Sequence, residues 1–419
     1  MVKIIICITI VIISNIYRLY PQNTQRPFPQ NKGYFDSSIK PKNHSQAEMN
    51  KATSLFYTVW KKAYVRHDCA DSKHYYILND EENVKGKGSN ICVSEGQGYG
   101  MQIMALMAGY DKDAKTIFDG MFKFSRAHPS NKSPYLMSWS ILKGCITNTR
   151  KENNSSATDG DLDIAISLFM ADNQWGSKGE INYRNEALKN LSAILKYEIN
   201  YKNHTILLGD ANVLGDDDYN DIRSSDFMPA HLHVFNKFYP NDEWIKVIDN
   251  TYRIYEKLQL EYSPKARLLP DFIVCKSKKY SPASSNYLES KHDGEYYYNA
   301  CRVPFRVAID YLIFGDVRAK KMLDPLCDWI QEKSVNNADK ICAGYHLNGE
   351  SIAGRNYAVP AFVCPFAIGS MTDKENQEWV NDCWDCIADF EFKDYRYFDN
   401  SIQMLSLLIL SGNYWLPQP

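Results

Sequence analysis

Apolar side chains recur every three to four residues along most of this chain, and this spacing constrains its fold more than any other feature. Segments 52–63, 187–195 and 244–255 each place apolar residues on one face, and similar stretches lie at 99–109, 113–124, 161–171, 303–313, 317–331, 360–370, 377–390 and 401–411. This period is typical of α-helices, whereas the alternation expected of strands is scarce. Each apolar face must be buried against another helix, so the pattern predicts an all-α domain of about a dozen helices, arranged as helical hairpins in a ring or bundle.

The composition allows a large core and argues against a nucleic-acid partner. Of the 419 residues, 44% are hydrophobic and 23% are charged, and the net charge is −2. Basic residues are scattered rather than clustered, so neither nucleic acid nor an anionic membrane surface is expected to bind. Aromatic residues make up 13% of the chain. Their rings usually fill cores, but they also cover the apolar faces of sugars.

Three regions of the chain differ in character. Lys3 precedes an apolar run at 4–13, which predicts a secretory signal peptide over residues 1–20. Residues 21–45 are rich in Pro, Asn, Gln and Lys, which predicts a disordered or linker arm. The dense globular domain is expected over 46–419. A secreted protein without stable membrane association after signal cleavage follows from this reading.

The cysteines and glycosylation signals fit a secretory route. Cys7 lies in the expected signal, and ten of the 11 cysteines remain, an even number that permits occasional disulfides. A lone CxxC at 383–386 has no second pair at zinc-ligand spacing, so no metal is expected. Candidate glycosylation sites, which would make the protein a glycoprotein, are Asn43, Asn131, Asn153, Asn154, Asn190 and Asn203.

Three polar segments stand out against the helical pattern. Residues 94–101 read SEGQGYGM, residues 157–165 read ATDGDLDIA, and residues 287–306 form an acidic, aromatic stretch that runs into an apolar helix. Each has an ordinary explanation. Ser94 and Glu95 suit the start of a helix, acids in a first helical turn complement the helix dipole, and charged loops are usually solvated. Three carboxylates in five residues exceed what capping requires.

Together and in this order, the three segments resemble glycoside hydrolase family 8, and the resemblance runs over residues 50 to 416. It continues through Arg223–Pro229 and the terminal Ser411–Trp415. It implies an (α/α)6 barrel, a catalytic domain over 46–419, and an inverting glycosidase that acts on a polysaccharide as a monomer without cofactor or metal. The dozen helices read independently fit six inner and six outer helices.

The resemblance implies that Glu95 is the general acid and that Asp159 binds and helps distort the sugar next to the scissile bond. An inverting enzyme needs one protonated carboxyl for the leaving oxygen and one carboxylate that activates water on the opposite face of the sugar. Glu95 therefore needs a raised pKa, from apolar surroundings or nearby carboxylates such as Asp159.

The general base departs from the commonest pattern of the family. Many members carry Asp three residues before the Arg that corresponds to Arg302, and this chain has Asn299 there. The branch of chitosanases and lichenan-cutting glucanases has a non-acid at this position and takes a Glu from the preceding loop. Glu289 is the candidate, and Glu295 and Asp293 in the same loop stay open as alternatives.

Supporting residues follow with less specific signals. Trp139 is expected to stack on a sugar, Arg302 to orient a carboxylate or hold Asn299, and further residues to line subsites, namely Tyr99, Asp226, His231 and Asn299 itself. Packing or capping explains each of them equally well.

The expected activity is endo-cleavage of β-1,4 or mixed-linkage β-1,3-1,4 glucan. Chitosan is the alternative substrate, since the acidic residues Asp210, Asp216, Asp217, Asp218 and Asp221 would suit a cationic polymer. A glycan-binding protein that has lost catalysis is a further alternative, suggested by Asn299.

Overall fold

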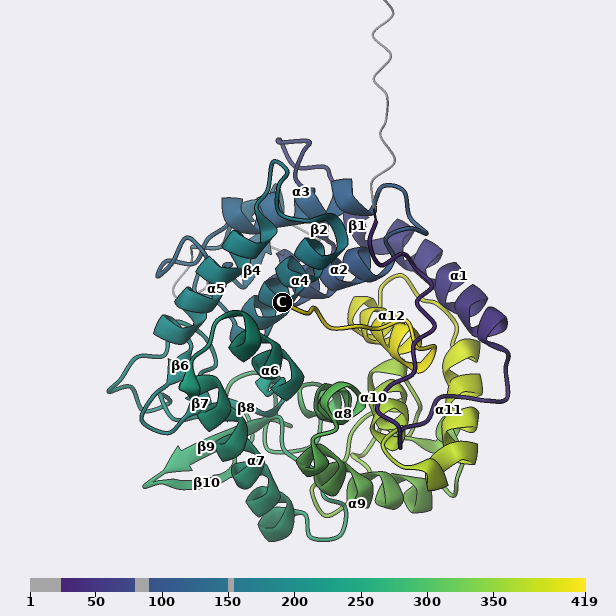
Figure 1. Ribbon diagram of the computed structural model, residues 1–419. Coiled ribbons are helices and arrows are strands. Elements are labelled where there is room, and N and C mark those ends of the chain that lie inside the picture. Colours follow the sequence, from purple (N-terminus) through teal and green to yellow (C-terminus); the bar gives the residue numbers. More distant parts are fainter. Residues whose placement is uncertain (1–23, 80–89, 150–153) are drawn as a thin grey trace, which may run out of the picture.

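In a computed structural model of the chain, residues 24–79, 90–149 and 154–419 are described, and six of the helices form a closed inner ring (Figure 1). Each of these helices packs against the next, and the last packs against the first. The inner helices are α2 (Ser94–Leu106), α4 (Thr158–Trp175), α6 (Pro229–Phe238), α8 (Val303–Phe314), α10 (Pro360–Ser370) and α12 (Tyr397–Leu410). The expected signal peptide and Asn153 lie outside the described residues.

The other six helices surround this ring. The main contacts are α3 on α2, α5 on α4, α7 on α6, α9 on α8, α11 on α10, and α1 on α12, and α9 also packs on α10. The outer helices are α1 (Gln46–Tyr64), α3 (Ala114–Ala127), α5 (Tyr183–Tyr197), α7 (Asp242–Tyr262), α9 (Val317–Lys333) and α11 (Gln377–Asp389). The expected all-α fold, an (α/α)6 barrel, is confirmed.

The two rings differ in how their sequences distribute charge. The inner helix α10 carries no charged residue and is buried on all sides. The outer helix α7 buries one face that includes Trp244, Val247 and Leu258, and it carries Lys, Arg, Asp and Glu elsewhere. A helix that is apolar all round belongs inside a protein, whereas an amphipathic helix covers its surface. The distribution of charged residues therefore distinguishes the inner helix α10 from the outer helix α7.

Two helices differ from the sequence reading. The short α6 was not predicted, because polar His231, His233 and Asn236 interrupt its apolar pattern. The helix α2 begins at Ser94, before the apolar stretch, and so includes three glycines. Gly98 allows α2 to pack closely on α4, because a Cβ there would lie 2.6 Å from the Asp163 side chain, and Gly160 of α4 has the same role, because a Cβ there would overlap Ser94. Gly96 and Gly100 lie instead against Tyr397 and Ile77.

Short antiparallel strands lie between the helices of the barrel. They form the pairs β1–β2 and β6–β7 and the three-stranded sheets β3–β4–β5 and β8–β9–β10. Their bounds are β1 Val65–Arg66, β2 Tyr76–Ile77, β3 Asn90–Val93, β4 Ser140–Leu142, β5 Ile146–Thr147, β6 Ile199–Asn200, β7 Thr205–Ile206, β8 Ile222–Arg223, β9 Phe272–Lys276 and β10 Lys279–Pro282. Pairing of β8 with β9 sets Arg223 opposite Phe272.

Residues 24–45 form an ordered strap, so the expectation of a disordered arm is wrong for these residues. Backbone N–H groups of the strap donate to carbonyls at or just beyond the C-terminal ends of five inner helices, namely those of Gln174, Ala108, Gly412, Leu312 and Met371. The ends of helices leave carbonyls without intrahelical partners, and the strap supplies donors. Phe28 and Ile39 of the strap are buried, whereas Phe35 is 44% exposed.

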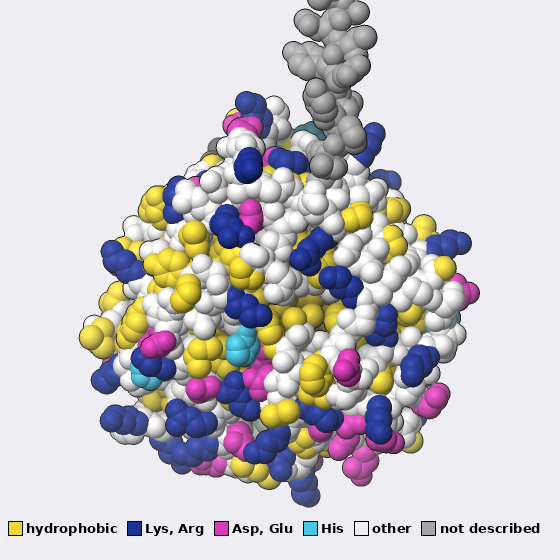
Figure 2. Space-filling view, in the orientation of Figure 1, with side chains coloured by type: hydrophobic (Ala, Val, Ile, Leu, Met, Phe, Trp, Pro, Cys, Tyr) yellow, Lys and Arg dark blue, Asp and Glu magenta, His cyan; other side chains and the backbone are white. Residues whose placement is uncertain are grey.

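The strap lies across the face of the barrel turned to the viewer in Figures 1 and 2. In Figure 2 this face is covered by side chains, with Lys and Arg spread among Asp and Glu. One end of the barrel is therefore closed by the strap, and the inner helices begin at the other end. None of the helices within the described ranges has the length and apolar character needed to cross a membrane.

The thiols and glycosylation signals are only partly as expected. One disulfide, Cys69–Cys145, joins the loop after β1 to the turn between β4 and β5, and the other cysteines of the described ranges are free thiols. The Asn190 side chain is fully buried, and its Oδ1 accepts a hydrogen bond from Arg126. Asn190 cannot carry a glycan in the folded protein, which corrects the expectation for this site.

The strap gives a first testable prediction. Replacing the buried Ile39 by Ala should lower the free energy of unfolding by about 2–3 kcal/mol, because it removes packed methylene groups and leaves a cavity. Urea unfolding followed by circular dichroism measures this change. Val317→Ala is the control, because Val317 is 70% exposed and should cost less than about 0.5 kcal/mol. Equal effects of the two substitutions would show that the strap adds little stability.

Candidate active site

A cavity of about 290 Å³ opens where several inner helices begin. Its walls come from the first turns of α2, α4 and α12, the segment before α8, strand β8 and the loop that precedes Asn299. The lining residues are Val93, Ser94, Glu95, Trp139, Ala157, Asp159, Arg223, Glu289, Tyr298, Asn299, Arg302 and Phe398. Most of the sequence-predicted site residues thus meet in one place.

One guanidinium holds two carboxyl groups in this cavity. Arg302 Nη1 donates to Glu95 Oε2 at 2.5 Å and to Asp159 Oδ2 at 2.9 Å. The Tyr397 hydroxyl donates to the other oxygen of Glu95 at 2.9 Å. Glu95 and Asp159 are each the second residue of their helices, α2 and α4. Because these two helices pack closely together, their first turns present both carboxyls to the same arginine.

The surroundings drive the pKa values of these two carboxyls apart. Burial raises the pKa of Glu95, and the charge of Asp159 raises it further against the opposing effect of Arg302. Burial acts on Asp159 as well, but the guanidiniums of Arg223 and Arg302 outweigh it and lower the Asp159 pKa. Glu95 therefore keeps its proton in a pH range where Asp159 is ionised. Such a divided pair supplies a proton donor beside a fixed negative charge.

A third carboxyl enters the cavity from the loop before Asn299. Glu289 Oε2 accepts a hydrogen bond from Asn299 Nδ2 at 2.8 Å, and Glu289 Oε1 lies 3.4 Å from Arg223 Nη2. Its side chain is 46% exposed, the most accessible of the ion-paired acids in the cavity. Solvent reaches it readily, as a water-activating group requires.

The other two acids of this loop have structural tasks. Asp293 is fully buried, and its carboxylate accepts hydrogen bonds from the backbone N–H groups of Leu288, Glu289 and Ser290 at 2.7–3.0 Å. Glu295 accepts from the Leu347 N–H and lies 3.1 Å from His346. Neither Asp293 nor Glu295 lines the cavity. Glu289 alone among these three acids does, and Asp293 fixes the backbone that carries it.

Glu95 and Glu289 are joined by a chain of hydrogen bonds. Arg302 Nη1 donates to Glu95, Arg302 Nη2 donates to Asn299 Oδ1 at 2.8 Å, and Asn299 Nδ2 donates to Glu289. Two side chains thus stand between the carboxyls and fix their relative placement. The amide of Asn299 accepts on one side and donates on the other, which a carboxylate in its place is unable to do.

Aromatic side chains form part of the wall. Trp139, Tyr298 and Phe398 line the cavity, and the Arg302 guanidinium lies 5.7 Å from the centre of the Phe398 ring. The backbone of Trp139 is anchored on both sides: its N–H donates to Ser155 at 2.9 Å, and its carbonyl accepts from Ser94 at 3.1 Å. Half-buried rings of this kind suit a ligand with apolar faces and polar edges.

Three residues predicted to line subsites lie behind the wall, which corrects those expectations. Tyr99 is fully buried and accepts a hydrogen bond from Arg302 at 3.3 Å. His231 is buried beside Asp163 at 3.1 Å. Asp226 is buried 3.5 Å from Arg223, and burial raises its pKa to about 7 despite that guanidinium. Their helical positions could not be distinguished from lining positions before the crossing angles of the helices were known.

Sequence reasoning gave no role to two residues that contact the predicted site residues. Arg223 faces three carboxylates, with Glu289 at 3.4 Å, Asp226 at 3.5 Å and Asp159 at 3.7 Å. Tyr397 reaches Glu95 from α12, about 300 positions along the chain. The available signal for Arg223 is an arginine within the family-like segment 223–229. Nothing in the local sequence distinguishes Tyr397 from the many core tyrosines.

A buried acidic network supports the segments that carry Trp139 and Asp159. Asp161 Oδ1 accepts from the Met137 N–H at 2.9 Å, and the Ser156 hydroxyl donates to Glu198 at 2.5 Å. The Ser156 N–H donates to Asp210 at 2.8 Å. Burial raises the pKa of both Asp161 and Glu198 well above the usual range; Asp161 raises the Glu198 pKa further, whereas the hydrogen bond with Glu198 acts to lower the Asp161 pKa. This network explains why the 157–165 segment holds more acids than its helix start needs.

Comparisons with known proteins agree on one family. A model described as glycosyl hydrolases family 8 matches residues 44–412. An endoglucanase of Bacillus sp. (strain KSM-330) is 40% identical over 94% of this chain and 82% of its own length, and a beta-glucanase of Niallia circulans is 39% identical over 93% and 91%. The apo structure of a β-1,3-1,4-glucanase from Paenibacillus sp. X4 superposes with a TM-score of 0.87 at 38% identity, and the match covers 95% of this chain and 100% of that one.

Proposed function

Because the chain belongs to glycosyl hydrolases family 8 and is a glycoside hydrolase, we propose that it is an inverting endo-β-glucanase of β-1,4 or mixed-linkage β-1,3-1,4 glucan. Glu95 is the general acid in this proposal and Glu289 the general base. The observation that carries it is the single cavity in which a buried carboxyl with a raised pKa and an accessible carboxylate are held apart by Arg302 and Asn299.

The proposed reaction needs each of these groups in one protonation state. Glu95 gives its proton to the glycosidic oxygen as the bond from that oxygen to the anomeric carbon breaks. A water molecule attacks the same carbon from the opposite face, and Glu289 takes the proton that this water loses. The product has the inverted configuration. Asp159 stays ionised between Arg302 and Arg223, where its negative charge suits the positive charge that develops on the sugar.

Asn299 has a positioning role in this mechanism. Its amide links Arg302 to Glu289 and so orients the base relative to the acid. An aspartate at this position would set a second carboxylate against Glu289 at hydrogen-bond distance, and two such groups do not ionise together easily. The presence of Asn299 and the use of a loop glutamate therefore belong together.

A glucan substrate is favoured over chitosan. The relatives named above are an endoglucanase, a beta-glucanase and a β-1,3-1,4-glucanase. Of the acids that suggested a cationic polymer, Asp210 holds the Ser156 backbone, and Asp221 accepts from the Cys275 N–H and the Tyr287 hydroxyl. None of the acids between 210 and 221 lines the cavity. The argument for chitosan from these residues is thereby weakened.

We also propose that the protein is secreted. The positively charged start and apolar run at residues 1–13 fit an export signal, and the Cys69–Cys145 disulfide suits an oxidising compartment. Exposed Asn43 and Asn131 are the more accessible candidates for glycosylation. A monomeric state stays a prediction.

Substrate assays test the proposed activity. Release of reducing ends should be strong on lichenan and carboxymethyl cellulose and weak on chitosan and xylan, and Glu95→Gln should abolish it because the amide has no proton to give. Clear turnover of chitosan without turnover of any glucan would reverse the choice of substrate. Retention of polysaccharide with no turnover of any of the four would support a binding protein that has lost catalysis.

The assignment of the base has its own test. Glu289→Gln should lower kcat by about 10²- to 10⁴-fold and leave KM nearly unchanged, because the amide cannot take a proton from water. Glu295→Gln is the matched control from the same loop and should keep most of the activity. If Glu295→Gln is the inactive variant, Glu289 is not the base.

The division of pKa values predicts a shift in pH dependence. The general acid works only when protonated, so activity falls as pH rises through the Glu95 pKa. Asp159→Asn removes a charge that raises this pKa and leaves Arg302 to stabilise ionised Glu95. The alkaline limb of kcat/KM should therefore move to lower pH, together with a reduced maximum. The limb should stay in place in Glu295→Gln, and an unmoved limb in Asp159→Asn would contradict the role of Asp159.

A further inference from the structure

Three side chains of metal-ligand type gather between α6, α8 and the start of α9, outside the substrate cavity. His233 of α6, Asp310 of α8 and Asp316, the N-cap of α9, place one imidazole nitrogen and two carboxylate oxygens within 4.8 Å of one another. His233 Nε2 lies 3.5 Å from Asp310 Oδ1 and 3.7 Å from Asp316 Oδ2. Among the residues described by the structure, no other set of three such side chains is this close.

Two atoms that face each other in this cluster have no hydrogen-bond partner. Asp310 is fully buried, and its Oδ2 accepts from the Tyr252 hydroxyl at 2.7 Å, but its Oδ1 accepts from no donor. His233 Nε2, the atom directed at this oxygen, also lacks a hydrogen bond. A buried carboxylate oxygen without a donor is costly. The arrangement therefore requires a positive group at this point.

A protonated His233 is one candidate for that group, but its geometry is poor. One N–H cannot donate well to two carboxylates, and both separations exceed the length of a normal N–H···O hydrogen bond, about 3.2 Å at most. A metal ion bonded at about 2.0–2.2 Å to tetrahedral ligands sets those ligands about 3.3–3.5 Å apart. The two separations from His233 Nε2, 3.5 and 3.7 Å, are close to this range, and the two carboxylate oxygens lie within 4.8 Å of each other.

We propose that His233 Nε2, Asp310 Oδ1 and Asp316 Oδ2 form a binding site for one divalent cation of the zinc class. A set of one imidazole and two carboxylates suits Zn²⁺, Co²⁺ or Mn²⁺, whereas Ca²⁺ and Mg²⁺ take oxygen ligands. The His233 side chain is 23% exposed, which gives an ion access to the site. The ion would join α6, α8 and the start of α9, so its role is structural.

Neighbouring groups already hold the two aspartates in place. Tyr252 donates to the second oxygen of Asp310, and Arg318 makes a forked contact with Asp316 at 2.6–3.1 Å. Outer hydrogen bonds of this kind orient metal ligands. Asp316 Oδ2 accepts from both Nε and Nη2 of Arg318, so an ion at Oδ2 requires the Nε–H to bond to Oδ1 alone, from which Nε lies 3.0 Å.

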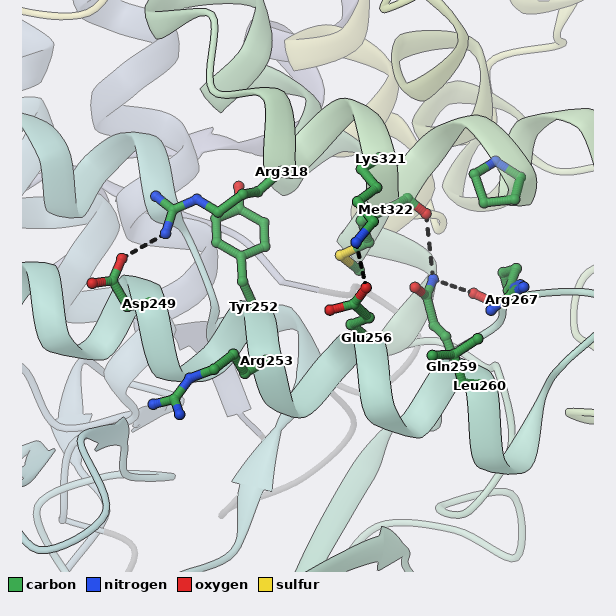
Figure 3. Close-up of a pocket in the computed structure, with 11 residues that line it drawn as sticks. Asp249, Tyr252, Arg253, Glu256, Gln259, Leu260, Arg267, Arg318, Lys321 and Met322 are labelled. Carbon is green, nitrogen blue, oxygen red and sulfur yellow. Dashed lines mark hydrogen bonds and ion pairs between the residues drawn. The ribbon is translucent and has the colours of Figure 1, made fainter.

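The supporting groups form one wall of a groove between α7 and α9. Figure 3 shows Arg318 beside the ring of Tyr252, with Asp249 on the far side of the guanidinium. This groove has a volume of about 410 Å³ and continues past Glu256 and Lys321, which are paired at 2.6 Å. The proposed site therefore lies just beneath the outer surface of the barrel, behind Tyr252 and Arg318.

Direct binding measurements test the proposal. After treatment with EDTA and its removal, the full-length protein is titrated with ZnCl₂ in a calorimeter, and Co²⁺ is added to a second sample as a visible-absorption probe of the ligands. We expect one equivalent of Zn²⁺ to bind, a rise in Tm on binding, and Co²⁺ bands typical of mixed nitrogen and oxygen ligands. CaCl₂ and MgCl₂ should produce no comparable binding.

Substitutions assign the site. His233→Gln and Asp310→Asn should each weaken Zn²⁺ binding on the order of 100-fold. His204→Gln is the control, because His204 is also paired with a buried carboxylate, Glu243 at 2.6 Å, but without a third ligand. If Asp310→Asn does not fold, His233→Gln alone decides. Absence of Zn²⁺ binding to the wild type, or binding that His233→Gln leaves unchanged, would overturn the proposal and leave a protonated His233 as the counter-ion.

Discussion

Two arginines four residues apart reach across the barrel to two aspartates four residues apart on α4, and the centre of the molecule depends on this pair of contacts. Arg306 binds Asp163 at 2.5 and 3.0 Å, fully buried, and Arg302 binds Asp159 at 2.9 Å at the floor of the cavity. Asp163 also accepts from Gln102 of α2 and lies beside His231 of α6. Four inner helices are thus fixed to one carboxylate, and removal of any partner would leave an uncompensated buried charge.

The position of the Arg302–Asp159 contact depends on the Arg306–Asp163 contact. Because Arg306 sets the rotation and height of α8 against α4, Arg302 arrives where it can serve Glu95, Asp159 and Asn299 together. One positive charge is then shared among more carboxyl groups than it can neutralise. Arg223 and Arg302 together lower the Asp159 pKa, whereas burial keeps the Glu95 pKa raised despite Arg302. The same arginine that joins α8 to α4 thereby holds a buried carboxyl with a raised pKa in the cavity.

The two ends of the barrel differ in what stabilises them. At one end the inner helices leave unsatisfied carbonyls, and the strap 24–45 caps them with its backbone N–H groups. At the other end short strands and buried acids such as Asp293 and Asp210 hold loops in place without filling the space above them. The strap closes one end of the barrel. The cavity with its polar lining opens to solvent at the other end, where a polysaccharide would enter.

The sequence by itself determined the helices other than α6 in the described part of the chain, which of them are amphipathic, and which carboxyl residues the family pattern includes. Periodicity is a local property of the sequence. The residues around Glu95 and Asp159 also match the family pattern directly. It did not identify α6, where His231 and His233 break the apolar pattern, nor the ordered strap, whose stability comes from contacts with distant helix ends.

Only the tertiary structure decided which of Glu289, Asp293 and Glu295 enters the cavity, that Tyr99 and Asp226 lie behind its wall, and that Arg223 and Tyr397 contact its acids. These outcomes depend on helix rotation and loop path, which are set by packing between residues hundreds of positions apart. The local sequence does not settle them, because the same Tyr, Asp, Glu or Arg can lie in a core, at a helix cap or in a site, depending on its tertiary contacts.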